Sequence, residues 1–390
     1  MTIGAVVRRE FDQIFRKARN RISFIFLAGM VYAVVLGFLY APGLVKQIPF
    51  AVYDADGSAL SRAIGRAFED SDIIAVRSYA ESREELMEMI ARHEAYGAIE
   101  IPADFSEEVK GHGQGRVLLV LDGSNTMLMG SISPEAQQIL IAASNHEMAR
   151  MLALKTGVSQ ERVGRVLNPV QMEYRVLSNP TRSYLYFFLI GLALASFQAG
   201  MLYASGASIH YEYNHAEETR DTNPYVLLLG KFITYWLCSF AAFTLIMLGA
   251  YFWGLTPKAP VYQLYLLSSS FAASVISWGL LASSLFRREA SYVRAVTIYA
   301  VPAFILAGYM WPLSSMGSAI NLISGVFPMK WVADSMRSLY IAGEAYQWEW
   351  NACVLWMGCA VCLALAPLAY RRGVTRDFGA SLCHCEKSCG

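Results

Sequence analysis

Charge is scarce in this sequence. Charged residues make up 16% of the 390 residues and hydrophobic residues 55%, whereas about a quarter of the residues in a soluble domain are charged. This shortage excludes an ordinary soluble protein and indicates a membrane protein. The formal net charge is only +1, so the composition gives no argument for nucleic-acid binding.

Motifs for catalysis and cofactor binding are also missing. No stretch matches Gly-x4-Gly-Lys-Ser/Thr, because residues 230–231 lack the upstream glycine and the hydroxyl residue that hold phosphates and Mg²⁺. One turn after His146-Glu147, arginine stands where a zinc protease has its second histidine. Asp54 and Asp56 are better explained as a turn with a helix cap. We therefore expect no catalytic residue, no metal and no cofactor in this chain.

Cysteine is unevenly distributed. None of the seven cysteines lies between residues 44 and 237, so a polar domain within that interval would fold without disulfides. Cys383, Cys385 and Cys389 could bind a soft metal, but a tail of reduced thiols is the interpretation we favour.

Long uncharged runs are present instead. Residues 184–208 and 232–257 contain no charged residue, and each is longer than the about 20 residues with which a helix crosses a bilayer. The run at 295–329 is too long for one span and is interrupted by proline and glycine. It predicts one span and then a broken or re-entrant element at 312–341. Further spans are predicted at residues 22–45, 259–286 and 350–370, which makes six in all.

Basic residues orient the chain. Residues 1–21 carry six Lys and Arg and an apolar stripe at helical spacing, which predicts an amphipathic helix on the membrane surface. Arginine also clusters at 287–294 and 371–376. With six spans, all these clusters fall on one side, which the positive-inside rule assigns to the cytoplasm. Both termini, including the tail 371–390, are then cytoplasmic.

Residues 46–182 have a different character, because short β-like runs alternate with helical runs. This alternation predicts a compact α/β domain, which is extracytoplasmic because long segments translocate regardless of charge. The expected strands are 48–53, 73–79, 96–101, 117–121 and 170–176, and the expected helices are 59–69, 83–91, 103–110 and 134–156. The fold class is therefore mixed: a polytopic α-helical membrane protein whose domain at 46–182 precedes a five-helix block at 183–370.

A short charged segment, residues 209–224, joins the second and third spans. Its four carboxylates and one arginine keep it out of lipid. It is too short for a domain and too polar for a passive turn, so we predict that it contacts another protein. The candidate contact residues are Glu212, Tyr213, Asn214, His215, Glu217, Glu218, Arg220 and Asp221.

Phrases in and around this segment carry a family resemblance. Residues 212–215 read Glu-Tyr-Asn-His, and residues 223–231 read Asn-Pro-Tyr-Val-Leu-Leu-Leu-Gly-Lys. They resemble the Glu-x-Gly-Thr and Ser-Pro…Leu-Leu-Gly-Lys phrases of the permeases of type-2 ABC exporters, although Asn-His replaces Gly-Thr. Residues 52–62, 101–105, 121–125 and 327–337 are similar to further phrases of that family.

The resemblance implies that 209–224 is a coupling helix that docks in a groove of an ABC ATPase subunit. It also implies a dimer of six-span permease halves, homodimeric or heterodimeric, that lies in the bacterial inner membrane. ATP and Mg²⁺ would bind to the ATPase partner. Members with a large external domain often work with a periplasmic adaptor protein and an outer-membrane channel. We therefore expect an export subunit for drug-like, lipid or other small substrates; the substrate-binding residues stay unassigned.

Two other classes of membrane protein compete with this interpretation. An ion-coupled carrier normally has an ionisable residue near the middle of a span, and the central portions of these spans have none. A receptor or sensor would bind a ligand in its extracytoplasmic domain and would need a cytoplasmic output domain. The predicted cytoplasmic segments are only short tails and loops.

Overall fold

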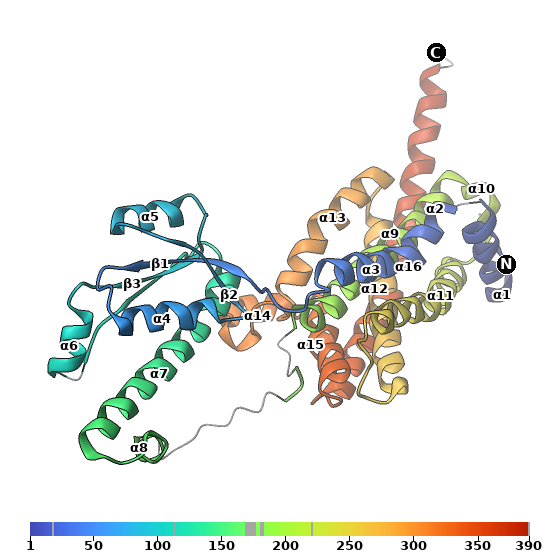
Figure 1. Cartoon of the computed structure of the whole chain (residues 1–390). Helices are drawn as coiled ribbons and strands as arrows, with labels where there is room; N and C mark the ends of the chain where they lie inside the picture. Colours follow the sequence, from blue (N-terminus) through green and yellow to red (C-terminus); the bar gives the residue numbers. More distant parts are fainter. Residues whose placement is uncertain (18, 113, 168–176, 180–182, 220, 389–390) are drawn as a thin grey trace. The chain divides into compact units, whose positions relative to one another are not determined.

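The chain forms two compact units. The computed structural model describes all residues except 18, 113, 168–176, 180–182, 220 and 389–390. One unit is Leu44–Arg175, and the other combines Met1–Gly43 with Val176–Gly390 (Figure 1). The first is an α/β unit and the second is a helix bundle. The strand predicted at 170–176 lies outside the described residues.

The α/β unit contains a four-stranded sheet with the order β2-β1-β3-β4. Strands β1 and β2 are parallel, as are β1 and β3, whereas β4 is antiparallel to β3. The strands are β1 (Ile48–Asp54), β2 (Ile74–Tyr79), β3 (Gly97–Ile101) and β4 (Leu118–Leu121). The helices are α4 (Ala59–Glu69), α5 (Arg83–Ala91), α6 (Phe105–His112), α7 (Thr126–Thr156) and α8 (Gln160–Leu167). The strand at 170–176 apart, each predicted element overlaps an observed one.

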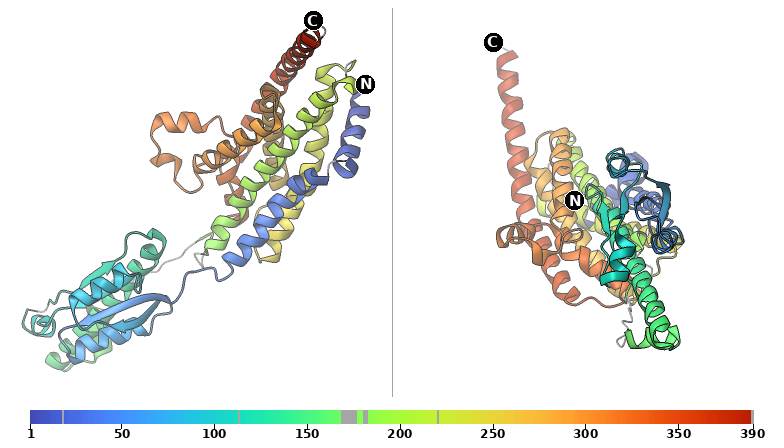
Figure 2. Two further views of the ribbon diagram at one scale, coloured as in Figure 1. Left: turned by 90° about the horizontal axis from the view of Figure 1, so that it is seen from above. Right: turned by 60° about the vertical axis from the view of Figure 1, so that its left-hand side comes forward.

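Strand β1 is buried on both faces, which explains its almost unbroken apolar sequence. Phe50 packs on Phe68 of α4, with ring centroids 5.1 Å apart. On the other face, Ala51 joins a smaller apolar cluster with Leu86 of α5. Helices thus cover both sides of the sheet (Figure 2).

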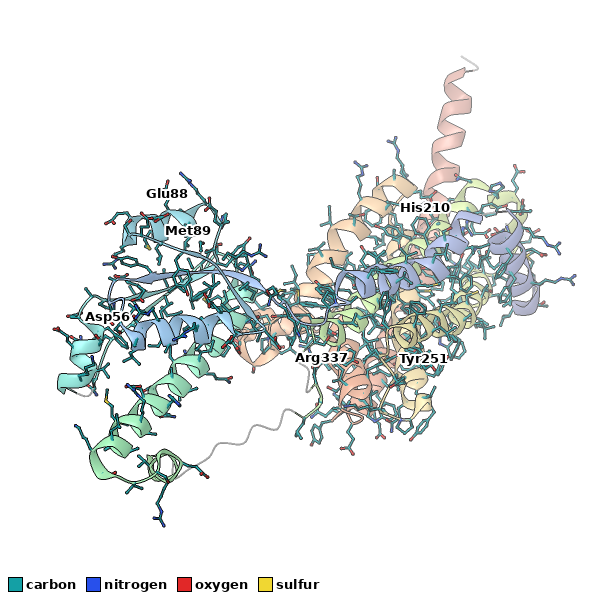
Figure 3. The ribbon with its side chains drawn as sticks, viewed as in Figure 1. Asp56, Glu88, Met89, His210, Tyr251 and Arg337 are labelled. Carbon is teal, nitrogen blue, oxygen red and sulfur yellow. The ribbon has the colours of Figure 1, made fainter. Side chains whose placement is uncertain are left out.

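The turn between β1 and α4 is held by side-chain caps. Ser58 accepts hydrogen bonds from the amides of Leu60 and Ser61, so it is the N-cap of α4. Asp56, labelled in Figure 3, accepts hydrogen bonds from the amide and hydroxyl of Ser106 at 3.1 and 2.9 Å. Burial alone would raise the pKa of Asp56, but hydrogen bonds from Ser58 and Ser106 outweigh it and lower that pKa.

Replacing Asp56 with asparagine should destabilise the contact between this turn and α6 by about 1–2 kcal/mol at neutral pH. Because the folded-state pKa is lowered, the carboxylate stabilises the fold above its unfolded-state pKa, and this stabilisation is lost as the pH falls through the folded-state pKa. Hydrogen exchange of residues 48–69 in the full chain should therefore be faster in the variant at pH 7, with little difference in acid. Asp70→Asn, at an exposed position, is the control; equal exchange in both variants at pH 7 would contradict the assignment.

Helix α7 begins earlier than predicted, at Thr126 rather than near Pro134. Asn125 caps it by accepting hydrogen bonds from the amides of Met127 and Leu128, both at 3.2 Å. Pro134 is tolerated inside the helix, although it lacks the amide that would close one backbone hydrogen bond. A proline in the pattern was therefore a poor guide to the start of this helix.

The helix bundle contains four helices that are long and apolar enough to cross a membrane, among the residues described. They are α9 (Tyr184–Asn214), α11 (Pro224–Phe252), α12 (Val261–Leu285) and the part Trp348–Gly373 of α16 (Trp348–Ser388). The first predicted span contains a shorter apolar helical stretch, Ser23–Leu39, and the start of the run predicted to hold the fifth span, 295–329, overlaps α13 (Glu289–Ile305). The protein is thus a polytopic helical membrane protein, and the count of six spans stays a prediction.

The remaining elements of the bundle are short. The N-terminal segment comprises α1 (Ile3–Asp12), a π-helical turn η1 (Gln13–Lys17), α2 (Arg19–Ile22), a second π-helical turn η2 (Ser23–Leu27) and α3 (Ala28–Leu39). The others are α10 (Ala216–Thr219), a 3-10 turn η3 (Leu313–Ser315), α14 (Ser318–Ser324) and α15 (Pro328–Ile341). Helix α3 packs along α9 and α11 (Figure 2).

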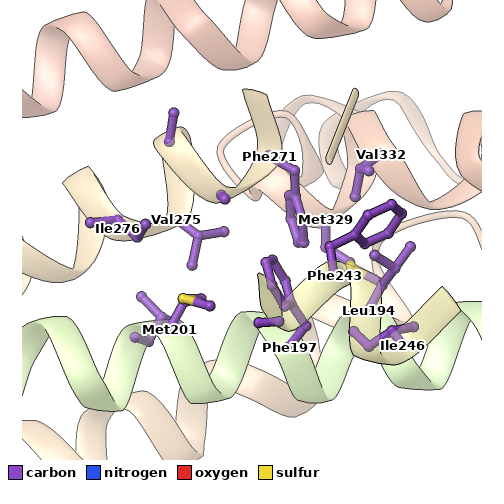
Figure 4. Close-up of a cluster of buried hydrophobic side chains, with 14 of the residues drawn as sticks. Leu194, Phe197, Met201, Phe243, Ile246, Phe271, Val275, Ile276, Met329 and Val332 are labelled. Carbon is purple, nitrogen blue, oxygen red and sulfur yellow. The ribbon is translucent and has the colours of Figure 1, made fainter. Parts of the chain in front are cut away.

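The core of the bundle lies around α9 and α12. Phe197 of α9 and Phe271 of α12 have ring centroids 6.1 Å apart, and Phe243 and Met329 lie beside them (Figure 4). Six serines along α12 donate hydrogen bonds to backbone carbonyls, five of them within α12 itself. Small side chains of this kind let helices approach closely, so these serines serve packing.

Two predicted features of the bundle can be set beside the helix bounds in the structure. In the apolar run at 295–329, α13 ends at Ile305 and only η3 and α14 follow before α15; the broken or re-entrant element at 312–341 stays a prediction. Arg337 of α15 (Figure 3) donates a hydrogen bond to the carbonyl of Tyr309 at 3.2 Å and so holds the broken region. Helix α16 continues beyond Arg371-Arg372, because arginine ends an apolar run but favours helix.

Candidate functional site

The segment 209–224 forms a tight helical connection between α9 and α11. Helix α9 continues to Asn214, so the first part of the predicted loop is helix, and no proline or glycine interrupts it there. After the single turn of α10, Asn223 accepts a hydrogen bond from the amide of Tyr225 at 3.0 Å, and Pro224 takes the first position of α11. We call this end of the bundle, where α1 also lies (Figure 1), the α10 end.

Five ionisable side chains meet at the α10 end, and we call them the ion cluster. They are Arg9 and Glu10 of α1, Glu212 of α9, Glu218 of α10 and Lys231 of α11. Arg9 lies 3.0 Å from Glu212 through Nη1 and 2.9 Å from Glu218 through Nη2. Lys231 Nζ lies 2.8 Å from Glu212 Oε1 and also pairs with Glu10. The ion cluster therefore joins four helices.

Most of the ion cluster is sealed from water. The side chains of Glu10, Glu212 and Lys231 are 0% exposed, and that of Arg9 is 15% exposed. Glu212 also accepts a hydrogen bond from the hydroxyl of Thr219, at 3.1 Å. Buried charges of this kind are tolerated only when paired, and removing one partner costs about 3–5 kcal/mol.

A third cation, Arg21, binds the N-terminal segment to the bundle nearby. Arg21 is buried and donates hydrogen bonds to the carbonyl of Ala207 at 3.2 Å and to the hydroxyl of Tyr235 at 3.4 Å. Its guanidinium also lies 5.6 Å from the centre of the Tyr211 ring. The N-terminal segment is thus bound to α9 and α11, the two helices that flank α10.

The predicted contact residues differ in exposure. Asn214, His215, Glu217, Glu218 and Asp221 are exposed. Glu212 is not: its carboxylate is enclosed by the ion cluster, so in this structure it supports α10 from within. Tyr213 is half-buried, and its hydroxyl donates to the carbonyl of Ser284 at 3.2 Å. Arg220 lies outside the described residues.

Three members of the ion cluster were missed by the sequence reasoning. Arg9 was assigned to lipid headgroups, Lys231 was considered as part of a failed phosphate motif and of a family phrase, and Glu10 was given no role. Val6, Glu10 and Gln13 recur at i, i+4 and i+7 and are all buried, but two of the three are polar, so this face gave no apolar repeat in the sequence. Helix α1 therefore packs this face on α11, in addition to its predicted apolar stripe.

The α/β unit has a cavity of about 490 Å³ between α4, α6 and α7. Phe105, Met148 and other apolar residues line it, together with Arg116 and Glu147. Glu147 pairs with Arg150 at 2.7 Å, whereas Arg116 has no ion partner among the described residues. The volume falls in the range of small-molecule sites, and nothing in the sequence analysis predicted it.

Four helices that are long and apolar enough to cross a membrane, with a buried ion cluster beside a one-turn helix, define a polytopic helical membrane protein. Residues 21–368 match the family model of the ABC-2 family transporter proteins, and the chain belongs to that family.

Three relatives show the extent of the similarity. The chain is 21% identical over 376 residues to the probable multidrug ABC transporter permease YbhR of Escherichia coli K12, covering 94% of this chain and 97% of YbhR. It is 22% identical over 273 residues to the probable multidrug ABC transporter permease YbhS of the same strain, covering 68% and 69%. It is 21% identical over 360 residues to ABC transporter G family member 20 of Dictyostelium discoideum, covering 88% of this chain and 47% of the relative.

Proposed function

We propose that this chain is the permease subunit of an ATP-driven exporter and that a separate ABC ATPase drives it through residues 209–224. The substrate is drug-like, lipid or another small molecule, and it moves outward across the bacterial inner membrane. Membership of the ABC-2 family and the multidrug permease names of two relatives support this class of function. ATP and Mg²⁺ bind to the ATPase chain.

The ion cluster is the observation that carries the proposal. Force applied to α10 moves helices only if α10 is rigidly attached to them, and Glu212, Glu218 and Thr219 attach it to α1 and α11. The exposed residues Glu217 and Asp221 remain available for a basic groove of the ATPase. A packed, two-state helix interface converts such a small push into a change between inward-open and outward-open arrangements.

The proposed assembly has further parts. A second permease half, identical or homologous, completes the dimer. The α10 end and both termini lie in the cytoplasm, and the α/β unit lies outside, where a periplasmic adaptor protein and an outer-membrane channel would meet it. Side-specific labelling tests this orientation: Glu217→Cys and Glu84→Cys must react from opposite sides of the membrane.

Alanine at both Glu217 and Asp221 should reduce co-purification of the ATPase subunit by about 10-fold, because each lost ion pair at an interface contributes about 1 kcal/mol or less. The full chain is co-expressed with a tagged ATPase, and the amounts are compared after affinity capture. The matched control is Glu344→Ala with Glu349→Ala, two exposed carboxylates outside segment 209–224. Unchanged capture and unchanged export would remove this segment from the mechanism.

The cavity in the α/β unit favours one alternative, a sensor whose extracytoplasmic domain binds a ligand. In that case a small molecule should protect α4 and α7 from hydrogen exchange while nucleotide-dependent efflux is absent. An exporter requires efflux that depends on both this chain and the ATPase. Efflux from cells with and without the chain, across a panel of compounds, separates the two functions.

A further inference from the structure

A second cavity, of about 400 Å³, opens at the α10 end between α9, α12 and α16. Its wall combines two kinds of side chain. The apolar part includes Leu281, Leu285, Leu365 and Leu368, and the basic part is Arg287 and Arg372. None of these six residues belongs to the ion cluster. Residues 209–224, which we call the coupling segment, contribute only Tyr213 to the wall.

The two arginines lie where apolar helices end. Helix α12 ends at Leu285, two residues before Arg287, and the uncharged run in α16 ends at Tyr370, two residues before Arg372. Cations at such positions lie at the level of the lipid headgroups. At 1.5 Å rise per residue, Leu368 lies about 6 Å further along α16, toward the acyl chains.

The leucines beside the arginines are open to the surroundings. Leu285 is 70% exposed, and Leu365 and Leu368 are each 47% exposed. The chemistry that complements this wall is an anionic group beside the two guanidinium groups and a hydrocarbon chain along the leucines. Guanidinium binds phosphate through paired, charge-assisted hydrogen bonds, and basic pockets between spanning helices suit anionic headgroups.

We propose that this cavity binds an anionic phospholipid, with its phosphate at Arg287 and Arg372 and an acyl chain along the leucines. The exposed leucines favour a lipid over an acidic protein segment, which would leave them uncovered. Tyr213 connects the site to the coupling segment, because its hydroxyl donates to Ser284 of α12 and its ring stacks on Tyr370 of α16 at 5.3 Å. The bound lipid braces α12 and α16 beside α10. The lipid site does not depend on the proposed ATPase contact.

The test measures lipid retained by the purified full chain. Wild type and Arg287→Gln/Arg372→Gln are solubilised with phosphatidylglycerol or phosphatidylcholine and examined by native mass spectrometry. The double variant should retain about 10- to 30-fold less phosphatidylglycerol, as expected for two lost arginines near a membrane surface. Phosphatidylcholine retention should not change.

Two controls distinguish lipid binding in this cavity from non-specific attraction between basic residues and anionic lipid. Arg288→Gln/Arg294→Gln removes the same charge from residues that do not line the cavity and should retain phosphatidylglycerol as wild type does. Arg287→Lys/Arg372→Lys keeps the charge and should lose at most a few-fold. Equal loss in both glutamine variants would overturn the proposal, because it would reduce the effect to non-specific attraction.

Two further outcomes would also overturn it. Inorganic phosphate that raises the thermal unfolding midpoint of wild type as much as phosphatidylglycerol does would define an anion site without a lipid. Normal phosphatidylglycerol retention with lost ATPase capture in Arg287→Gln/Arg372→Gln would assign the cavity to a protein contact.

Discussion

Replacing Lys231 with methionine is expected to destabilise the helix bundle by about 3–5 kcal/mol. The variant leaves Glu10 without its only hydrogen-bond donor among the described residues and takes one of two cations from Glu212. Both carboxylates are 0% exposed, so water cannot take the place of the lost ammonium group. The measurement is the thermal unfolding midpoint of the detergent-purified full chain, together with capture of the ATPase subunit.

A second substitution distinguishes a lost ion pair from a lost side chain. Glu10→Met added to Lys231→Met removes both members of the buried pair, and replacing a buried pair with apolar residues is often neutral or stabilising. The double variant should therefore recover more than half of the lost stability, which is a strongly non-additive result. Lys17→Met, at an exposed position of the N-terminal segment, is the control. If Lys231→Met unfolds at the same midpoint as Lys17→Met, the ion cluster does not hold the bundle together.

Local patterns were enough to locate most of the elements. Strand β1 follows from one apolar run at 48–53, and α4 follows from a capping serine and an amphipathic repeat, both of which are properties of adjacent residues. The apolar runs likewise located the spanning helices α9, α11 and α12, because a hydrocarbon layer fixes both length and polarity. The ends of the helices were predicted less accurately than their positions. The charged residues Glu212 and Arg371 ended the apolar runs but did not end the helices.

The candidate site depends on contacts that no local pattern contains. Glu10 and Lys231 are 221 residues apart in sequence, and their pairing requires α1 to fold back on α11. Glu212 was predicted to face a partner because its neighbours are polar, and its burial follows only from the arrival of Arg9 and Lys231. The exposed residues of 209–224 could be chosen from sequence, but the support beneath them could not.

Substituting Gly200 with alanine should prevent close packing of the N-terminal segment on α9 and destabilise the bundle by about 3 kcal/mol, at the upper end of the usual cost of overpacking. A Cβ atom on Gly200 would lie 2.1 Å from the carbonyl oxygen of Phe24 and 3.3 Å from Cβ of Ala28. The first of these neighbours is backbone in the turn η2, so no side-chain rotation can relieve the clash and the whole segment must shift. The thermal unfolding midpoint of the full chain measures the loss.

Two other glycines provide matched comparisons for Gly200→Ala. Gly4 lies in α1, where an added Cβ meets nothing within 4 Å, so Gly4→Ala should leave stability unchanged or raise it slightly. Gly37 faces the ring of Trp253, a side chain that can move, and Gly37→Ala should have an intermediate effect. Because α1 and η2 belong to one segment, Gly200→Ala should also weaken the pairing of Glu10 with Lys231 and reduce ATPase capture. A variant with a lower unfolding midpoint but full ATPase capture would show that the ion cluster holds α1 in place without the contact at Gly200.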